Sequence, residues 1–160
     1  MVGFRSNSEM EQFNRTFFVD TVTYQRTRIF RIARYALLFI EVLVFYRNQG
    51  KYALHEFVVM PDHVHLLITP GRSCSLERAM QFIKGGYSYR VRKEFRAAHE
   101  VWQRSFTLHR VMDVRDYQQH QKYIHENPVK ARLVAAPEQW EYGSARGLVA
   151  LDPPPEYLRG

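Results

Sequence analysis

The sequence contains very little cysteine, since Cys74 is the only one in 160 residues. A single thiol cannot form an internal disulfide, and it cannot supply the cysteine ligands of a structural zinc site. Disulfides persist mainly in oxidising surroundings. The composition therefore excludes a disulfide-stapled secreted scaffold, and we expect a cytoplasmic protein.

An apolar run long enough to cross a membrane is also missing. The apolar stretch 35–46 contains Glu41 and is bounded by Arg34 and Arg47, so it falls short of the roughly 20 residues that a spanning helix needs. The first ten residues contain no apolar core of signal-peptide length. No Gly-rich phosphate-binding loop with a following Lys is present, which argues against ATP as a cofactor. We expect no membrane partner.

Positive charge and aromatic rings are plentiful instead. The net charge is +7, and aromatic residues make up 14% of the chain. A basic protein suits a polyanionic partner, and rings among Arg and Lys suit unstacked bases. Charge alone leaves the partner open, because a basic protein without a nucleic acid would have the same composition.

Hydrophobic periodicity predicts seven elements in one domain. Strands are expected at 16–24, 52–60, 63–69 and 108–111, and helices at 29–48, 76–98 and from Asp113 to about Glu126. This order predicts an α+β fold with a ferredoxin-like or RRM-like βαββαβ antiparallel sheet, its middle strands central, its helices on one face, and an additional C-terminal helix. Residues 14–147 form the domain, with a flexible lead-in at 1–13 and a tail at 148–160.

The stretch 57–68 carries two histidines two residues apart, His63 and His65, after a Pro-Asp turn. Alternate side chains of a strand point to one face, so both imidazoles share a face while Val64 points into a core. Two imidazoles on a rigid sheet suit one metal ion. Two ordinary hydrogen-bonded histidines would show the same spacing.

The last predicted helix carries His120, Tyr123 and Asn127 at spacings of three and four, which makes one polar stripe. We expect this helix to end before Pro128, because the residue preceding a proline avoids helical geometry. A helix that follows the fourth strand can return across the sheet and bring Tyr123 toward the histidine pair.

The helix expected at 76–98 contains Gly85-Gly86 within a basic and aromatic segment. Missing side chains allow another backbone to approach, either DNA or RNA or a neighbouring helix. The candidate nucleic-acid-binding residues are those around this pair, together with one Arg further on: Lys84, Tyr87, Tyr89, Arg90, Arg92, Lys93, Arg96 and Arg104.

Three motifs together resemble a known family. The segment 60–67 resembles the histidine-hydrophobe-histidine motif of the single-tyrosine transposase superfamily, and 123–131 resembles the tyrosine helix of its REP-associated branch, related to IS200/IS605 transposases. The segment 102–106 also resembles a family pattern. The likeness covers roughly residues 14–145.

The resemblance implies a nuclease and strand transferase that acts on single-stranded or hairpin DNA through a 5′-phosphotyrosine. Tyr123 would be the nucleophile, and His63, His65 and Asn127 would hold Mg²⁺ or Mn²⁺. His120, one turn before Tyr123, is a candidate general base. We expect a nucleoid-associated protein that acts as a monomer, with a homodimer as the alternative. The rival functions are a module that only binds hairpin DNA or RNA, and a hydrolase that uses water as its nucleophile.

Overall fold

The structure is a computed structural model that describes residues 15–160. In this part of the chain, four strands and three α-helices follow the predicted order: β1 Phe17–Val22, α2 Ala33–Asn48, β2 Tyr52–Val59, β3 His63–Pro70, α3 Leu76–Phe95, β4 Thr107–Arg110 and α4 Val114–Lys130. Short 3-10 helices lie in the connections: η1 Tyr24–Arg26, η2 Ile29–Arg31, η3 Pro137–Gln139, η4 Ser144–Arg146 and η5 Glu156–Leu158. The predicted lead-in at 1–13 lies outside the described residues.

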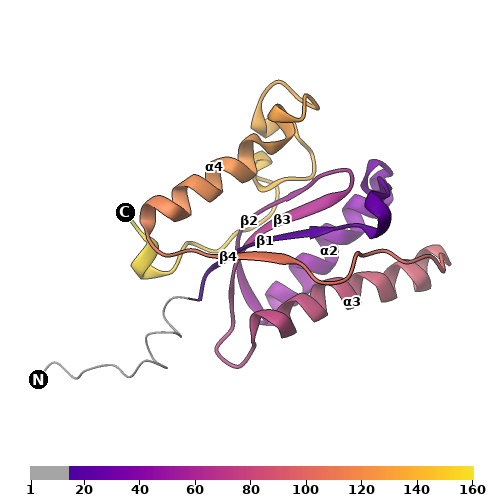
Figure 1. Cartoon of the computed structure of the whole chain (residues 1–160), viewed down its shortest axis with the longest axis horizontal. Coiled ribbons are helices and arrows are strands. Elements are labelled where there is room, and N and C mark those ends of the chain that lie inside the picture. Colours follow the sequence, from indigo (N-terminus) through magenta and orange to yellow (C-terminus); the bar gives the residue numbers. More distant parts are fainter. Residues whose placement is uncertain (1–14) are drawn as a thin grey trace, which may run out of the picture.

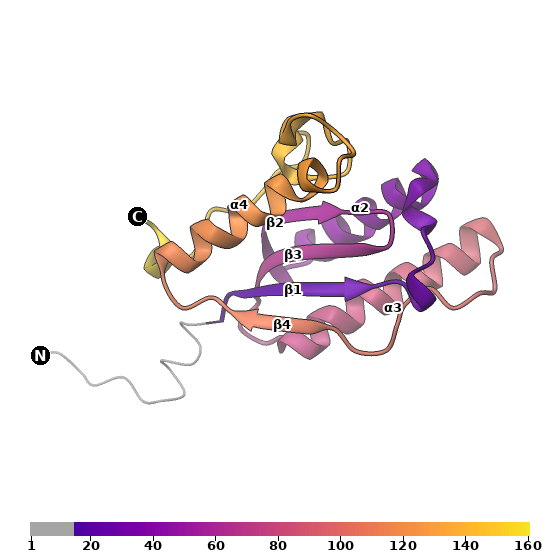
Figure 2. The ribbon, with the colours of Figure 1, turned by 45° about the horizontal axis from the view of Figure 1, so that its top comes forward.

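The strands form one antiparallel sheet in the order β2-β3-β1-β4 (Figure 2). This is the ferredoxin-like order that the sequence predicts. The expectation that the two middle strands are central was wrong for β2, which lies at an edge. The hairpin places β3 beside β2, but β1 pairs with the other side of β3, so β1 and β3 are central.

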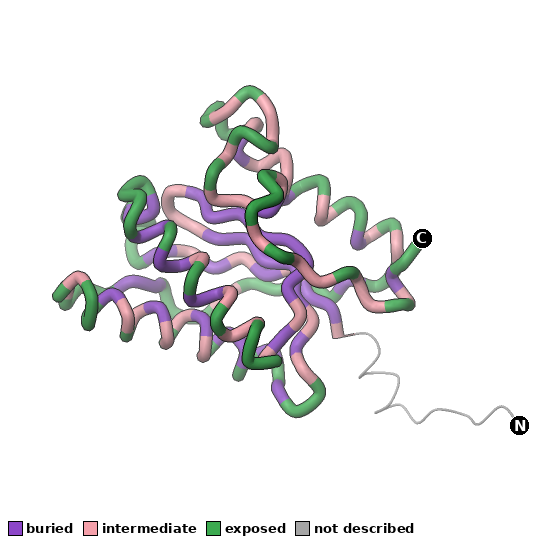
Figure 3. The backbone as a smooth tube through the Cα atoms, turned by 180° about the vertical axis from the view of Figure 1, so that it is seen from behind, coloured by how far each residue is buried: buried purple, intermediate pink, exposed green. Residues whose placement is uncertain are grey.

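Helices α2 and α3 cover one face of the sheet and build the larger core (Figure 1). Val64, Leu66 and Ile68 of β3 point into this core and are fully buried. Their alternation with the histidines follows from the pleat of a strand. Figure 3 shows the buried strands between helices whose outer sides are exposed.

Helix α4 covers the opposite face, where it builds a second, smaller core. Tyr117 and Ile124 of α4 pack there with Val58 of β2 and Leu67 of β3. Asp113 caps the helix by accepting a hydrogen bond from the Asp116 N–H at 2.8 Å, as the sequence predicts. The two faces of the sheet therefore differ in what they contact: one packs into the main core, and the other faces α4.

The helix ends differ from the predictions. α2 begins at Ala33 because the preceding residues form η2, and α3 ends at Phe95 because Arg96 is left-handed, with φ 53°. α4 continues through Pro128 to Lys130, so the predicted end before Pro128 was wrong. Pro128 lies in the last turn, where its missing N–H removes one helical hydrogen bond, and its ring is buried beside Pro137 and Trp140.

Residues 148–160, expected as a tail, pack along the edge of the sheet. The Asp152 N–H donates to the Leu54 carbonyl at 2.7 Å, and the Leu54 N–H donates to the Asp152 carboxylate at 2.8 Å. The same carboxylate pairs with the Arg47 guanidinium. Leu158 of η5 is buried in the smaller core. This segment therefore covers β2, whose backbone groups would otherwise form an open edge.

Candidate active site

His63 and His65 lie on the face of β3 that α4 covers, with their ring centroids 4.7 Å apart. His63 Nδ1 is 2.7 Å from Asp62 Oδ1. The Nδ1–H of His63 donates to this carboxylate, which leaves the lone pair of Nε2 free to bind a metal. A carboxylate behind a ligating histidine is a common arrangement because it fixes the tautomer and the orientation of the ring.

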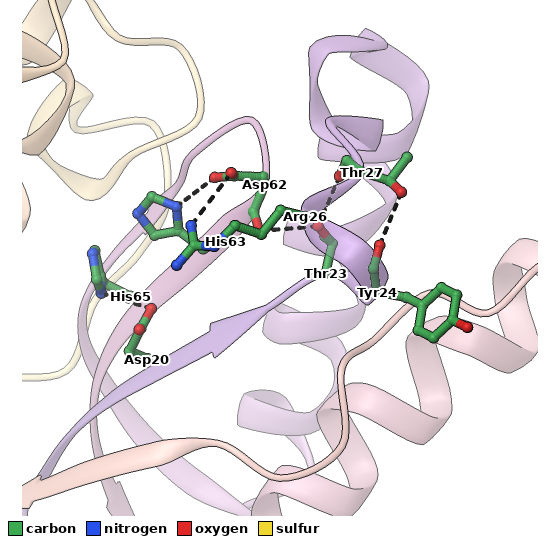
Figure 4. A network of polar contacts seen from close by, with 8 residues as sticks. All are labelled: Asp20, Thr23, Tyr24, Arg26, Thr27, Asp62, His63 and His65. Atoms are coloured by element: carbon green, nitrogen blue, oxygen red, sulfur yellow. Dashed lines mark hydrogen bonds and ion pairs between the residues drawn. The ribbon is translucent and has the colours of Figure 1, made fainter.

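Asp62 is itself held in place by the segment that follows β1 (Figure 4). The backbone N–H and the hydroxyl of Thr23 both donate to the Asp62 carbonyl at 3.0 Å, and Arg26 Nη1 lies 3.4 Å from the Asp62 carboxylate. Burial alone would raise the pKa of Asp62, but the hydrogen bond with His63 and the electrostatic effects of His63 and Arg26 lower it. The carboxylate that orients His63 therefore stays ionised.

Asp20 is a site residue that sequence reasoning missed. β1 pairs with β3 in a register that sets Asp20 opposite His65, and Asp20 Oδ1 lies 3.4 Å from His65 Nδ1. One ligand atom each from Asp20, His63 and His65 lie within 4.8 Å of one another. The sequence signal for Asp20 was a lone acid inside an apolar strand. Its position beside His65 follows only from the register between two strands that are distant in the sequence.

The protonation of His65 is decided by burial. Its side chain is 5% exposed, and burial together with the nearby His63 lowers the pKa of His65 to about 3. The imidazole is neutral near pH 7, so its contact with Asp20 is not an ion pair. Burial raises the pKa of the Asp20 carboxyl, an effect that the neighbouring His63 and Arg26 oppose.

The buried polar atoms of this cluster have no partners of their own. Within residues 15–160, Asp20 Oδ1 and both ring nitrogens of His65 are buried without a hydrogen bond. Buried polar groups are nearly always paired, so each such group needs an explanation. A divalent cation would supply the missing partner, and two imidazoles with a carboxylate suit one. The residues His63, His65 and Asp20 therefore fit a metal ion.

Tyr123 comes to the same place from α4. Its ring centroid lies 5.3 Å from that of His65 and 5.8 Å from that of Phe18. The side chain is 40% exposed, and it lines a cavity of about 420 Å³ with Asp20, His65 and His120. The structure thus brings the tyrosine of the last helix to the histidine pair within one chain, as the topology predicts.

His120 and Asn127 lie one turn before and one turn after Tyr123, and both are half-buried. His120 Nδ1 is 2.8 Å from the backbone oxygen of Asp116, so Nε2 is the nitrogen left for proton transfer. The ring of His120 packs on Phe18, with centroids 4.7 Å apart. The roles of His120 as a base and of Asn127 as a metal ligand stay predictions.

The position of α4 depends on a buried carboxylate in β2. An irregularity in the β2–β3 register after Leu54 turns Glu56 toward α4, and Glu56 is 6% exposed. Its carboxylate accepts hydrogen bonds from Gln121 and His125 of α4 at 2.9 and 2.8 Å, and from the hydroxyl of Ser144. Because the smaller core contains few apolar residues, this polar anchor fixes the rotation of α4 that presents Tyr123.

Glu56→Ala is therefore expected to lower the free energy of unfolding by about 2–3 kcal/mol, because it leaves several donors without their acceptor. Glu56→Gln is the matched control: it keeps an acceptor of the same size and should lose less. Urea denaturation measures both. A loss below about 0.5 kcal/mol in Glu56→Ala would show that the anchor does not hold the helix.

The structure corrects part of the predicted nucleic-acid surface on α3. Tyr87 was expected to stack on bases, but its side chain is fully buried and its hydroxyl donates to the Tyr35 carbonyl at 2.9 Å. That prediction was wrong, because Tyr87 lies four residues from both Ile83 and Val91 on the buried stripe of α3.

Gly86 serves helix packing. A Cβ at this position would lie 2.6 Å from the Tyr46 hydroxyl of α2, whereas one at Gly85 would meet nothing within 4 Å. The group that approaches Gly86 therefore belongs to the neighbouring helix and not to a nucleic acid. Without its side chain, α3 can approach α2 closely.

Two predicted cations have partners within the fold. The Lys84 ammonium donates to the carbonyls of Gln103 and Ser105 at 3.0 and 2.8 Å, and Arg90 pairs with Glu41 and Glu94. The remaining predicted residues are exposed: Tyr89, Arg92, Lys93, Arg96 and Arg104. These five can still reach a nucleic acid.

The fold and the site together define a class of protein. A ferredoxin-like sheet presents a histidine-hydrophobe-histidine pair on a central strand, and a following helix lays a tyrosine against it. The family model described as "Transposase IS200 like" matches residues 13–127. The chain therefore belongs to the IS200-like transposase family.

Individual relatives agree with this family. The chain is 26% identical over 112 residues to a REP-associated tyrosine transposase of Escherichia coli K12, covering 66% of this chain and 65% of the relative. It is 30% identical over 96 residues to a Haemophilus influenzae protein assigned as a REP-associated tyrosine transposase, covering 54% of each. The matches thus span between half and two thirds of these bacterial relatives. The predicted resemblance to the REP-associated branch is confirmed.

Solved structures share the fold. A REP-associated tyrosine transposase bound to a REP hairpin matches with a TM-score of 0.70 and 21% identity, covering all of this chain and 94% of that chain. A Deinococcus radiodurans structure described as a transposase matches with a TM-score of 0.52 and 23% identity, covering 70% of this chain and 88% of that chain. Among residues 15–160, no helix has the length and apolar character needed to cross a membrane.

Proposed function

We propose that this protein is a metal-dependent nuclease and strand transferase that acts on single-stranded or hairpin DNA through a 5′-phosphotyrosine at Tyr123. The observation that carries this proposal is the contact of the Tyr123 ring with His65, 5.3 Å between centroids, beside polar atoms of His65 and Asp20 that are buried without partners. The hairpin substrate is supported by the relatives, which are named for REP elements, and by the neighbour bound to a REP hairpin.

The proposed step is a transesterification. The Tyr123 oxygen attacks the phosphorus, forms a phosphotyrosine bond with the 5′ side of the cut, and loses its proton. The bond from phosphorus to the 3′ oxygen breaks, and that oxygen leaves with the electron pair and takes a proton to become a 3′-hydroxyl. One phosphodiester is exchanged for another, so the step needs no ATP. A strand hydroxyl can reverse it.

His63, His65 and Asp20 would hold Mg²⁺ or Mn²⁺ beside the Tyr123 cavity, which His65 and Asp20 line, with Asn127 as a further candidate ligand. When bound, such an ion neutralises charge on the phosphate and aligns the phosphorus for attack. A free tyrosine has a pKa of about 10, so its proton must be drawn away as the bond forms. The Nε2 of His120 is the candidate acceptor because His120 lines the same cavity as Tyr123.

One chain supplies every group of the proposed site, which supports a monomer as the working unit. The histidines come from β3 and the tyrosine from α4 of the same chain. We place the protein at the bacterial nucleoid, where dispersed palindromic repeats would provide hairpins.

Exposed cations at the end of α3 are the proposed contacts to the DNA backbone. Arg92 and Lys93 belong to the last turn of α3. This end of α3 lies at the end of the molecule that also carries the β2–β3 turn before His63 (Figure 1). Changing both to Ala should reduce the slope of log Kd against log salt by about 1.4, the value for two phosphate contacts to a single strand. Fluorescence anisotropy across a salt series measures this slope.

The matched control for that pair changes Lys51 and Arg72, at the opposite end of β3, to Ala. This control removes the same charge and should leave the slope closer to that of the wild type. Equal slopes in the two double variants would mean that only the net charge acts, and would remove α3 from the DNA surface.

The test of the proposed function is a cleavage assay with one hairpin oligonucleotide labelled in turn at each end, in the presence of Mn²⁺. A 3′ label should become covalently attached to the protein on a denaturing gel. A 5′ label should appear in a shorter free strand whose 3′-hydroxyl a polymerase can extend. Binding without either product would favour the module that only binds hairpins. Two free fragments without an adduct would favour hydrolysis by water.

A further inference from the structure

A second group of metal-ligating side chains lies outside the proposed catalytic cluster. His109 stands on the edge strand β4, while Asp116 and His120 are four residues apart on α4. One ligand atom from each lies within 4.8 Å of the others. The chain thus brings two imidazoles and a carboxylate together from two elements.

The three side chains already face one another. His109 Nε2 lies 2.8 Å from Asp116 Oδ2, and His120 Nδ1 lies 3.1 Å from Asp116 Oδ1. The two imidazoles are stacked, with centroids 4.7 Å apart and planes at 23°. Donors on one tetrahedral zinc ion are about 3.3 Å apart, given bonds of about 2.0–2.1 Å. Because the two imidazoles lie against different oxygens of Asp116, the carboxylate would have to turn slightly to offer one oxygen to the ion. His120 Nδ1 would exchange its hydrogen bond to the Asp116 backbone oxygen for the metal.

The carboxylate is held before any ion arrives. Asp116 Oδ2 accepts a hydrogen bond from the Met112 N–H at 3.0 Å, and the Asp116 N–H donates to Asp113 Oδ1 at 2.8 Å. These bonds fix the loop between β4 and α4. A ligand that is fixed in advance loses little freedom on binding, which favours affinity.

We propose that His109, Asp116 and His120 form a second metal site that takes a transition ion of the zinc class. Two imidazoles and one carboxylate are a common set of three protein ligands for zinc, and imidazole favours such ions over Mg²⁺. The side chain of His109 is 49% exposed, so solvent can enter and water can complete the coordination. The site would link the edge strand to the first turns of α4.

Occupancy would also affect the proposed chemistry, an effect that depends on the proposed function of Tyr123. His120 lines the cavity of Tyr123 and packs on Phe18. An ion bound to His120 would hold its ring and withdraw it from proton transfer. An ion held at this second site would therefore inhibit strand cleavage that Mn²⁺ supports at the first.

Isothermal titration with ZnCl₂ tests the site in a His63→Ala/His65→Ala background, which removes the first cluster and cannot catalyse. We expect about one equivalent to bind, and adding His109→Ala should weaken binding at least about tenfold. Adding His99→Ala, an exposed histidine outside the cluster, should change nothing. Circular dichroism confirms that each variant is folded.

Two results would overturn the proposal: no zinc binding by the background variant below about 100 μM, or binding that His109→Ala leaves unchanged. The three residues would then be a hydrogen-bonded cluster only. Because the background variant lacks the first cluster, neither result bears on whether Tyr123 cleaves DNA.

Discussion

Tyr123→Phe is expected to abolish the covalent protein–DNA product and to slow strand cleavage by at least about 10³-fold. Phenylalanine keeps the ring that packs on Phe18 and His65 but removes the oxygen that attacks the phosphorus. The fold and the metal ligands stay in place, so the loss should appear in the chemical step alone. Single-turnover cleavage of an end-labelled hairpin measures the rate, and mass spectrometry of the wild-type adduct locates the modified peptide.

Tyr89→Phe is the matched control for this variant, because Tyr89 is exposed on α3, away from the histidine pair, and phenylalanine keeps the ring that would stack on a base. It should keep the rate and the adduct of the wild type. Cleavage that survives in Tyr123→Phe would mean that water, or another hydroxyl, attacks the phosphorus. The hydrolase interpretation would then replace the proposed transferase.

His65→Ala is expected to remove Mn²⁺ binding and to reduce cleavage by at least about 10³-fold, while DNA affinity changes less than about threefold. His65 is the central donor of its cluster, since it lies between Asp20, His63 and Tyr123. Affinity for DNA comes mainly from contacts between cations and phosphates, and His65 is neutral and buried. The variant should therefore bind its substrate and fail to cut it.

Titration calorimetry with MnCl₂ and anisotropy with a labelled hairpin separate the two effects in His65→Ala. His99→Ala, which changes an exposed histidine, should behave like the wild type in both. If His65→Ala cuts DNA at the normal rate, the metal is not held by the histidine pair. If DNA binding falls as far as cleavage does, the residue supports the binding surface or the fold.

Local patterns in the sequence were enough to predict the order of elements and the central part of the site. Alternation along β3 placed His63 and His65 on one face and Val64 on the other, as the structure shows. The spacing of Tyr123 in the last helix and the ferredoxin-like order predicted that the tyrosine would meet this pair. These features depend on periodicity and connectivity, which the sequence displays directly.

Features that depend on contacts between distant segments could not be predicted in the same way. The register of β1 on β3 places Asp20 at His65, and no local pattern specifies that register. Glu56 lies inside the strand predicted at 52–60, yet an irregularity in β2 turns it toward α4. Basic neighbours suggested that Tyr87 binds DNA, although its spacing from Ile83 and Val91 marks the buried stripe. Tertiary packing decided each case.

In the proposed site, one cation between β1 and β3 lies beside the Tyr123 hydroxyl of α4 within a single chain. Anomalous diffraction at the manganese edge, from crystals grown with Mn²⁺, measures this most directly. We expect one strong peak bounded by His63, His65 and Asp20, about 2.0–2.3 Å from their ligand atoms, on the side that faces Tyr123. A manganese peak elsewhere, with this cluster empty at saturating Mn²⁺, would contradict it.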